Sequence, residues 1–446
     1  MLKTFRIGGV HAPENKLSAG ELPITLPLPE QAIIPLSQHI GAPAKPVVAK
    51  GDEVKAGTLI AEAAGFVSAN IHSSVSGVVA KIEEVVDASG YKKPAIIIDV
   101  KDDIWEDNIV RDEQGMTVSA DSTIDRLSSQ EIIERIKQAG IVGMGGATFP
   151  THVKLVPPPG NKADVLIINA AECEPYLTDD HVLMLEKGNE ILQGVQLLMK
   201  AAQVHKAFIG VENNKPDAIA HLSRMVAAYS GIEIVPLKPR YPQGSEKQLI
   251  DAIIDRQVAS GALPISVGAI VQNVGTAFAV YEAIVKNKPL IERIVTVTGK
   301  YLAHPCNLRV RIGTPVRYLI EYAGGMPEDT GKIVGGGPMM GKAWLSADIP
   351  VTKGVSGILL ISASEAQRKP ARNCIRCSKC VNICCMGLEP YRLMNLAEFK
   401  EWESMKQNNA LDCLECGSCS YICPANRPIL DYIKWGKNEL RAQAGK

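Results

Sequence analysis

The sequence predicts a multidomain protein in which a parallel α/β domain is flanked by two β-rich domains and followed by a small helical domain. Three observations lead to this prediction. Strand-like and helix-like segments alternate from residue 128 to residue 290, short strand patterns lie on either side of them, and eight of the eleven cysteines form two evenly spaced runs near the C-terminus. Alternating strands and helices are typical of a parallel sheet with right-handed crossovers. We divide the chain into an N-terminal arm (1–30), a first β domain (31–105), the α/β domain (128–290), a second β domain (291–366) and the helical domain (367–446).

Composition and charge exclude several classes of protein. The 446 residues are enough for three or four domains of ordinary size. Lys plus Arg and Asp plus Glu both number 48, so nucleic acid is not an expected partner. The most apolar window, Ile265–Val285, contains Gln272, Asn273 and Gly275, and fits a strand, a loop and a helix better than a membrane span. Residues 1–20 lack the apolar core of a signal peptide, so we expect reduced cysteines and a cytoplasmic protein.

The arm is rich in Pro and Gly and has no hydrophobic period, so we expect it to lie on another domain. In the first β domain, the segment Lys50–Gly57, followed by Ser73–Val79, resembles the biotinyl/lipoyl type of barrel-sandwich domain. Such domains modify a lysine at a hairpin tip. The equivalent turn, Phe66–Ile71, has no lysine, which favours a structural or docking role. The expected strands are Pro46–Val48, Thr58–Ala61, Gly77–Ile82 and Ala95–Val100.

The α/β domain shows helical periods and apolar strand runs in alternation. Ligands of parallel sheets bind beyond the carboxyl ends of the strands, so the segments that follow the strands are the candidate site. The expected helices are Gln130–Ala139, Glu190–Ala202, Ala218–Tyr229, Glu246–Ser260 and Thr276–Lys286. The expected strands are Asp164–Asn169, Ala207–Val211, Ile232–Leu237 and Val267–Val271.

The last two domains carry simpler patterns. Short strands around one helix, Val316–Ala323, indicate a small β-grasp-like domain. The helical domain is expected to contain one helix, roughly Tyr391–Met405, between the two cysteine runs. The expected strands of the β-grasp-like domain are Ile294–Thr298, Leu308–Ile312 and Ile358–Ile361.

Both cysteine runs read C-x2-C-x2-C-x3-C. This spacing is typical of a protein with two [4Fe–4S] clusters, in which the fourth cysteine of each run ligates the other cluster. One-electron transfer is the chemistry that such clusters support. The pattern predicts one cluster on Cys374, Cys377, Cys380 and Cys423, and a second cluster on Cys413, Cys416, Cys419 and Cys384.

Zinc and disulfides are the alternative explanations of these cysteines. Zinc sites pair two C-x2-C knuckles and have no use for a third evenly spaced cysteine. Disulfides require an oxidising compartment. Cys385 stands where the first run would normally carry a proline, and we expect an unliganded neighbour that could compete with Cys384. Cys173 and Cys306 are isolated and are expected to be structural.

Four segments of the α/β domain fall where the ligand crevice of the sheet should lie. The glycines of Gly143–Lys154 would let backbone N–H groups approach a phosphate or a flat ring, although such a loop can also be only a tight turn. Asn169–Pro175 ends a strand with two carboxylates, which could equally be solvated loop acids. Tyr241–Lys247 leads into a helix whose N-terminus could face an anion, or it is an ordinary Ser cap. Gln272–Thr276 ends a strand and opens a helix, and its alternative is a polar cap.

In their order, these segments resemble the flavin- and NADH-binding subunit of respiratory complex I, whose glycine loop reads G-R-G-G-A-G-F-P-T-G-x-K. The whole chain is more similar to the RnfC family, the C subunits of the Rnf complex, which is an ion-translocating NADH:ferredoxin oxidoreductase. Gly8–Lys16, the barrel-sandwich domain, the flavin segments, the β-grasp (SLBB-like) domain and the ferredoxin-type cysteine runs match that family in order. The resemblance covers nearly the whole chain.

The resemblance implies FMN and NAD(H) as cofactors in a Rossmann-like domain, in addition to the two clusters. FMN would lie against Gly143 and Gly145, with Lys154, Asn169, Glu172, Gly244, Asn273 and Thr276 around its ring and phosphate. NADH would stack near Phe149, with Glu174 and Glu246 holding the nucleotide. The chain departs from the complex I pattern at Met144, Ala171, Ser245, Gln272 and Gly275, and Ala171 bears most directly on a flavin hydrogen bond.

The function that the resemblance implies is electron exchange between NADH, FMN and two clusters, with no side chain acting as nucleophile or general acid. The expected partners are integral membrane subunits that couple the transfer to Na⁺ or H⁺ transport, a ferredoxin-type subunit, and ferredoxin as the distal redox partner. The expected place is peripheral, on the cytoplasmic side of the cell membrane.

Three other functions compete with this one. A diaphorase subunit of a soluble hydrogenase or formate dehydrogenase shares the flavin segments, but such subunits usually lack the barrel-sandwich domain and the Gly8–Lys16 signature. A non-catalytic adaptor would carry clusters without flavin. A subunit of a sodium-pumping quinone reductase resembles the first 360 residues, but it lacks the paired cysteine runs.

Overall fold

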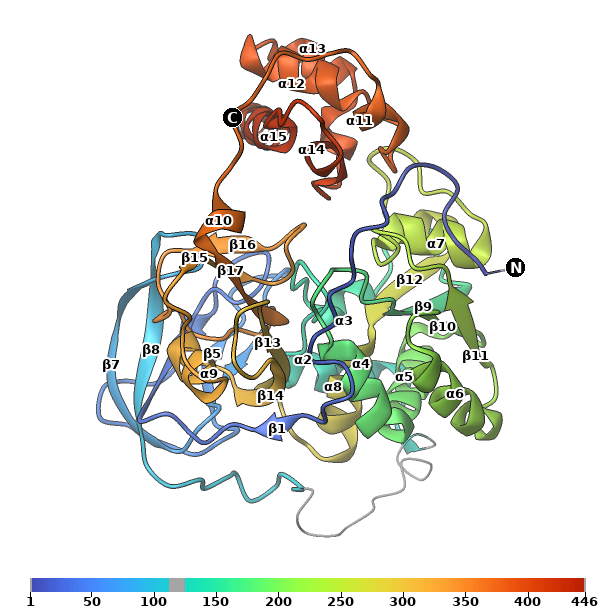
Figure 1. Ribbon diagram of the computed structural model, residues 1–446. Coiled ribbons are helices and arrows are strands. Elements are labelled where there is room, and N and C mark those ends of the chain that lie inside the picture. Colours follow the sequence, from blue (N-terminus) through green and yellow to red (C-terminus); the bar gives the residue numbers. More distant parts are fainter. Residues whose placement is uncertain (1, 112–123, 125, 445–446) are drawn as a thin grey trace.

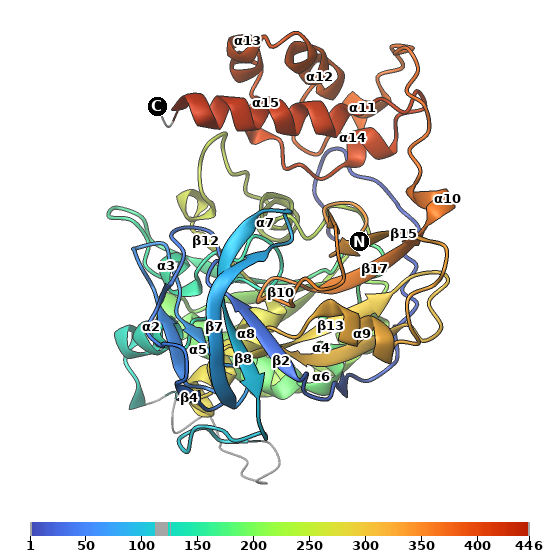
Figure 2. The ribbon, with the colours of Figure 1, turned by 90° about the vertical axis from the view of Figure 1, so that its left-hand side faces the viewer.

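The computed structural model describes residues 2–111, 124 and 126–444 (Figure 1). A helical domain stands at one end of the molecule, above β-rich parts and an α/β part that lie side by side (Figures 1 and 2). The N-terminal segment runs between the helical domain and the α/β part, where Gly9 N donates to Ile383 O and Val10 N donates to Tyr241 O, both over 2.8 Å. Within the described ranges, no helix combines the length and the apolar character needed to cross a membrane.

The α/β part is built on a four-stranded parallel sheet in the order β11-β10-β9-β12. All four strands were predicted, because each is an apolar run that can be buried on both faces of a sheet. Leu166 on β9 is level with Ala207 on β10 and with Ile270 on β12, so the neighbouring strands end at one edge. The bounds are β9 (Val165–Ala170), β10 (Ala207–Glu212), β11 (Ile232–Leu237) and β12 (Ala269–Asn273).

Helices cover both faces of this sheet. α2 (Ser129–Gln138), α5 (Gly188–Ala202), α6 (Pro216–Met225) and α8 (Val274–Val285) share one core with Leu166 and Ile168 of β9. α7 (Glu246–Ile254) packs on the other face against Val165 and Ile167. The predicted helix 246–260 is too long, because Asp255 turns into the left-handed region with φ of 59° and ends α7. Two short helices, α3 (Thr151–Lys154) and α4 (Asp179–Glu186), lie in the segments that follow the glycine loop and β9.

The first β domain consists of two facing sheets, in the orders β2-β8-β7-β4 and β3-β5-β6. Isoleucines from both sheets fill the space between them. The turn that replaces the modified hairpin tip exposes Phe66 but buries Ala69 in the core of the α/β part, so the turn is a packing contact between domains. The bounds are β2 (Gln31–Pro35), β3 (Lys45–Pro46), β4 (Glu53–Val54), β5 (Leu59–Glu62), β6 (Ile71–His72), β7 (Gly77–Val86) and β8 (Lys92–Val100).

The second β domain has a six-stranded sheet in the order β1-β14-β13-β17-β15-β16, covered by α9 (Val316–Tyr322). Its edge strand β1 (Ile24–Thr25) comes from the arm and pairs with β14, which ties the arm to this domain. The strands β13 (Glu292–Thr298), β14 (Cys306–Arg311) and β17 (Gly357–Ser362) were predicted. The strands β15 (Thr330–Gly335) and β16 (Lys342–Trp344) were not, since glycines and lysines interrupt their apolar pattern.

Lys353 joins three of these parts. Its side chain is 1% exposed, and its Nζ donates to Asn70 O over 2.8 Å and to Gly140 O over 2.7 Å. Asn70 belongs to the first β domain, and Gly140 precedes the glycine loop of the α/β part. Burial without a carboxylate partner lowers the pKa of Lys353 to about 7. His72 faces this amine, and burial and the Lys353 charge lower its pKa to about 3.

The C-terminal domain is helical. The single helix predicted over 391–405 is wrong: Lys400 adopts a φ of 59° and separates α12 (Pro390–Glu398) from α13 (Trp402–Gln407). α15 (Ile429–Ala444) packs against α12 through Leu393, Ile433 and their neighbours. The other helices are α10 (Ala363–Ala366), which leads into the domain, α11 (Lys379–Asn382), α14 (Ser418–Tyr421) and α15 (Ile429–Ala444).

Candidate functional site

The glycine loop lies at the carboxyl edge of the parallel sheet and is held at both of its ends. Gly143 N donates to Phe149 O over 2.9 Å, and Val142 forms a bridge with Pro150. Met144 N donates to Thr276 Oγ1 over 2.9 Å, which pins the loop to the first turn of α8. The exposed part of the loop is therefore a backbone surface with a fixed shape.

Asn273 connects this loop to the end of the sheet. It caps α8, since its Oδ1 accepts from Gly275 N over 2.8 Å. Its Nδ2 donates to Asp180 Oδ2 over 2.7 Å. Asn169, at the end of the neighbouring β9, donates from Nδ2 to Gly244 O over 2.7 Å. The predicted residues of three segments thus meet at one edge, as the topology of a parallel sheet requires.

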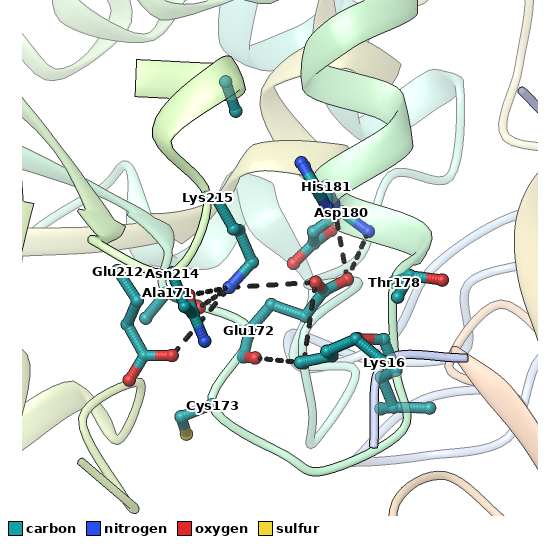
Figure 3. Close-up of polar contacts among 12 residues, drawn as sticks. Lys16, Ala171, Glu172, Cys173, Thr178, Asp180, His181, Glu212, Asn214 and Lys215 are labelled. Atoms are coloured by element: carbon teal, nitrogen blue, oxygen red, sulfur yellow. Dashed lines mark hydrogen bonds and ion pairs between the residues drawn. The ribbon is translucent and has the colours of Figure 1, made fainter. Parts of the chain in front are cut away.

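Glu172 lies beneath this edge, in a buried network of charges (Figure 3). Its Oε1 accepts from Asp180 N over 2.8 Å, at the start of α4, where a helix N-terminus favours an anion. Its side chain is 3% exposed and lies 3.8 Å from the Lys16 Nζ and 3.9 Å from the Lys215 Nζ. The alternative explanation, that Glu172 is a solvated acid on a loop, is therefore wrong.

Lys16, from the arm, is a second member of this network. Its Nζ donates to the carbonyl oxygens of Glu172, Glu174 and Leu177 over 2.6 to 2.9 Å. Burial lowers the pKa of this amine, and the Glu172 charge opposes that shift. The arm therefore shapes the chain between β9 and α4 from inside.

Sequence reasoning missed the third member, Lys215, which is 2% exposed. Its Nζ donates to Ala171 O over 2.8 Å and lies 3.8 Å from the Glu212 carboxylate. Burial raises the pKa of Glu212 to about 7. Burial and the charge of Glu172 also raise the pKa of Asp180. The lysine stands directly before the Pro that opens α6, and nothing in that local pattern separates it from a surface lysine.

Lys154 and Glu246, which were predicted to serve FMN and NADH, form an ion pair with each other over 2.7 Å. Lys154 also donates to Val271 O, on β12, over 3.1 Å. Both side chains are about one-third exposed, at 32% and 37%. The pair therefore lies at the rim of the carboxyl edge, where an anionic ligand could reach Lys154 from solvent.

Glu174 holds a loop of the second β domain against the crevice. Its carboxylate accepts from Met339 N over 3.1 Å and from Met340 N over 2.7 Å. Burial raises the pKa of Glu174 to about 7, although these hydrogen bonds and one from Tyr241 oppose that rise. A nucleotide that contacts Glu174 would therefore also meet the Met339–Met340 loop.

Tyr241 extends from the crevice to the helical domain. The side chain is 3% exposed, and its Oη donates to Cys416 O over 2.8 Å. The same hydroxyl contacts the Glu174 carboxylate. Gln248 adds a second contact, since its Nε2 donates to Cys385 O over 3.1 Å. Cys416 of the second run and Cys385, which follows the first run, are therefore both anchored on the α/β part, next to the predicted flavin segments.

Five cysteines line one pocket between the segment that follows α11 and the helices α12, α14 and α15. Four of them are Cys384, Cys413, Cys416 and Cys419, which is the set predicted for one cluster from the crosswise rule. The pocket is otherwise apolar, with Leu393 and Ile433 among its walls. Cys385 also borders it, and its thiol forms a hydrogen bond with the Cys416 sulfur.

The first run differs in exposure. Cys374 and Cys377 are exposed, whereas Cys380 is half-buried and interacts electrostatically with Cys423 of the second run. Throughout the described ranges, no three His, Cys, Asp or Glu side chains are grouped closely enough to hold a single metal ion. A four-iron cluster makes a different demand, because each thiolate binds a different iron and the thiolates stand further apart.

Three family models match the chain. The barrel-sandwich hybrid domain of RnfC matches residues 3–103. The Nuo51 FMN-binding domain matches residues 136–282, and the SLBB domain matches residues 294–343. These matches support the barrel-sandwich, flavin-domain and SLBB-like parts of the predicted fold class.

Curated relatives match along the full chain. The chain is 46% identical, over 99% of its own length and 95% of the relative's, to the C subunit of the proton-translocating ferredoxin:NAD(+) oxidoreductase complex of Clostridium ljungdahlii. It is 44% identical, over 99% and 98%, to the C subunit of the Na(+)-translocating ferredoxin:NAD(+) oxidoreductase complex of Acetobacterium woodii. It is 40% identical, over 98% and 84%, to the C subunit of the ion-translocating oxidoreductase complex of Rhodobacter capsulatus.

Among solved structures, the chain resembles the NAD⁺-reducing [NiFe]-hydrogenase. The air-oxidised form aligns with a TM-score of 0.52 at 18% identity, covering 74% of this chain and 70% of the other. The H₂-reduced form aligns with a TM-score of 0.50 at 19% identity, covering 73% and 65%. At this level of identity the likeness concerns the fold alone.

Proposed function

The chain belongs to the family of C subunits of ion-translocating ferredoxin:NAD(+) oxidoreductase complexes, and from this premise we propose that it is the subunit through which NADH exchanges electrons with the complex. It is an oxidoreductase subunit of an ion-translocating complex, and its flavin domain is of the Nuo51 type. The diaphorase alternative has only a distant likeness of fold in its favour.

One observation carries the proposal: Tyr241 links the predicted nucleotide crevice to the cysteine-lined pocket. Its hydroxyl contacts the Glu174 carboxylate on one side and the Cys416 carbonyl oxygen on the other. The predicted nucleotide crevice and the cysteine pocket therefore meet at one buried hydroxyl, which gives a short hydrogen-bonded route between them. Such an arrangement suits electron transfer.

The residues of the glycine loop fit a flat ring. Gly146 has no neighbour within 4 Å of where a Cβ would stand, and Gly145 is exposed at the same edge. We assign FMN to Gly143, Gly145, Lys154, Asn169, Glu172, Gly244, Asn273 and Thr276, and NADH to Phe149, Glu174 and Glu246. Glu172 would act through the backbone that it fixes, because its carboxylate is engaged with the start of α4.

When bound, FMN accepts a hydride from NADH and releases electrons singly, and four-iron clusters carry single electrons. The residues of this chain position these groups and exclude water. Lys154 supplies positive charge at the rim of the crevice, and the Lys16 network fixes the carbonyls of the chain behind it. The helical domain would be of the ferredoxin type.

The cluster assignment rests on the cysteine pocket. Cys413, Cys416 and Cys419 of the second run line it together with Cys384, the fourth cysteine of the first run. Apolar walls around thiolates are the environment of a buried cluster, whereas a zinc site would bring four ligands to one ion. We assign the remaining cluster to Cys374, Cys377, Cys380 and Cys423, with Cys385 as an unliganded neighbour.

The order of transfer follows from exposure. The pocket of the second run touches the α/β part through Tyr241 and Gln248. The first run exposes Cys374 and Cys377. We therefore propose that the second-run cluster is nearest to the flavin and that the first-run cluster faces the next carrier.

We also propose that the protein attaches to integral membrane subunits on the cytoplasmic face through protein contacts, with a ferredoxin-type subunit and ferredoxin as further redox partners. It should sediment with membranes when those subunits are present, and should not bind protein-free liposomes at physiological salt. Firm binding to such liposomes would contradict this attachment.

The function is tested on the anaerobically reconstituted chain. Lys154→Ala should weaken FMN retention, measured by flavin absorbance after desalting. Glu246→Ala should mainly raise the NADH concentration needed for half-maximal dye reduction. Lys247→Ala is the matched control, because this neighbouring residue directs its amine to Ala259 O over 3.1 Å. Unchanged NADH kinetics in Glu246→Ala with flavin bound would overturn the nucleotide assignment.

A further inference from the structure

The segment that carries the first cysteine run is strongly and one-sidedly charged. Residues 368–379 contain five cationic side chains and no Asp or Glu. Residues 367–379 are all exposed, and Figure 2 shows the chain between α10 and α11 at the outer edge of the helical domain. The cations are Arg368, Lys369, Arg372, Arg376 and Lys379.

Among the described residues, most of these cations have no carboxylate partner. Arg368 forms an ion pair with Asp431. In the part of the chain that the structure describes, no carboxylate lies within ion-pair distance of the other four side chains, Lys369, Arg372, Arg376 and Lys379. We call these four residues the basic collar. Four unpaired cations on one surface repel one another, which disfavours the folded state. We therefore expect these cations to have a role outside the folding of this chain.

The collar surrounds an apolar and redox-relevant centre. Ile375 is 68% exposed and lies between the exposed cysteines Cys374 and Cys377. An exposed apolar residue with charges around it is the composition of a transient protein interface, in which charge steers the approach and the apolar centre makes the contact.

The collar does not simply offset the negative charge of thiolates. If thiolates required adjacent unpaired cations, the second run should have them as well. The second run does have a neighbouring cation, Lys437, whose Nζ donates to Cys413 O over 2.6 Å, but Asp412 and Glu415 also stand between or beside its cysteines. Glu415 pairs with Lys437 over 2.6 Å, and Asp412 accepts from Ser260 of the α/β part. The charges of the second run are thus satisfied inside the molecule, and only the first run presents unpaired charge to solvent.

We propose that the basic collar is the docking surface for an acidic one-electron carrier protein, which approaches the first cysteine run through Ile375. This inference rests on the proposed function, because it needs a cluster at the first run. The transfer at this contact moves a single electron between the two redox centres and no atom, so no other reactant is consumed. Long-range attraction between opposite charges would raise the rate of encounter by about 10 to 100 times at low salt.

The test uses the reconstituted full chain and an acidic ferredoxin as the probe. The variant Lys369→Glu/Arg376→Glu is compared with Lys400→Glu/Lys406→Glu, which makes the same charge change at two exposed lysines of the same domain. The dissociation constant is measured by titration between 20 and 300 mM salt, a range over which screening lengths fall from roughly 20 to 6 Å. Carbodiimide cross-linking, which joins lysines to carboxylates in contact, then maps the attachment points.

We expect the wild-type dissociation constant to rise with salt and the collar variant to bind about tenfold or more weakly at low salt, with a flattened salt dependence. The control variant should stay within about twofold of the wild type. Cross-links should fall on Lys369 or Lys379. Equal weakening in both variants, or cross-links elsewhere, would overturn the docking surface.

Two other outcomes would also reject the proposal. One is a collar variant that binds the ferredoxin normally but has a shifted cluster potential, since the cations would then serve the cluster itself. The other is collar-dependent binding to anionic vesicles in place of the ferredoxin. NADH-dependent reduction of a small neutral dye serves as the reference: failure of this reaction in the wild type would count against the proposed function, independently of the collar.

Discussion

Two glycines of the same loop should respond differently to alanine, and the difference separates packing from flavin contact. A methyl group on Gly145 would stand 2.8 Å from the Asn273 Nδ2 and 3.0 Å from its Cβ and Cγ. Asn273 cannot easily yield, because it caps α8 and holds Asp180. A methyl group on Gly143 would meet no protein atom closer than the Phe149 carbonyl oxygen at 3.6 Å, which is ordinary contact.

The expected magnitudes follow from these contacts. Overpacking costs about 1 to 3 kcal/mol, and losing an Asn cap adds about 1 kcal/mol, so Gly145→Ala should lower the free energy of unfolding by roughly 2 to 4 kcal/mol. Gly143→Ala should leave that free energy within about 1 kcal/mol, since neither glycine has a positive φ and the added methyl makes only ordinary contact with the Phe149 backbone. If FMN lies against Gly143, the same methyl should nevertheless weaken flavin binding.

The assay has two readings on each variant: thermal unfolding of the flavin-free chain and titration with FMN by fluorescence quenching. Gly145→Ala should lower both the melting temperature and the affinity for FMN, whereas Gly143→Ala should lower only the affinity for FMN. Wild-type stability of Gly145→Ala would refute the packing argument. Wild-type flavin affinity of Gly143→Ala would refute the placement of the ring.

Four further substitutions have defined outcomes. In the wild type, the free energy of unfolding should increase between about pH 7 and 10.5, by an amount on the order of a few kcal/mol. The reason is that in this range the unfolded state still binds the Lys353 proton that the folded state has released. Lys353→Met should remove this increase. Parallel pH profiles of melting temperature in variant and wild type would reject this. Cys423→Ser should damage the cluster of the first run, whereas Cys385→Ser should leave the EPR signals of both clusters intact. Two intact cluster signals in Cys423→Ser would contradict the crosswise assignment. Tyr241→Phe should slow cluster reduction several-fold in stopped-flow experiments while NADH still bleaches the flavin, and an unchanged cluster rate would remove Tyr241 from the route.

The regular elements of the α/β domain could be predicted because local pattern determines them. The strands β9, β10 and β12 are apolar runs that are buried on both faces, and Ser128 with Glu131 forms a capping box that starts α2. Where local pattern and backbone conformation disagree, prediction fails. Asp255 and Lys400 adopt left-handed conformations that end or split helices, and neither residue type predicts such a conformation.

The candidate site shows the same division. The loop at Gly143, the cap at Asn273 and the cysteine runs follow from spacing and topology. The buried role of Glu172 does not, because it depends on Lys16 and Lys215, which come from distant parts of the chain. A lysine that is buried by tertiary contact has the same local sequence signal as one on the surface. The only sign of Lys16 was its place at the end of the Gly8–Lys16 signature.

The proposed function requires that one chain holds FMN and two four-iron clusters in electronic contact with NADH. Anaerobic reconstitution of the full chain, analysis of iron, sulfide and FMN, and titration with NADH under EPR observation test this requirement together. We expect about eight irons, about eight sulfides and one FMN per chain, with both cluster signals responding to NADH only when FMN is present. About four irons, no retained flavin, or cluster reduction by NADH without flavin would show that the chain does not work in this way.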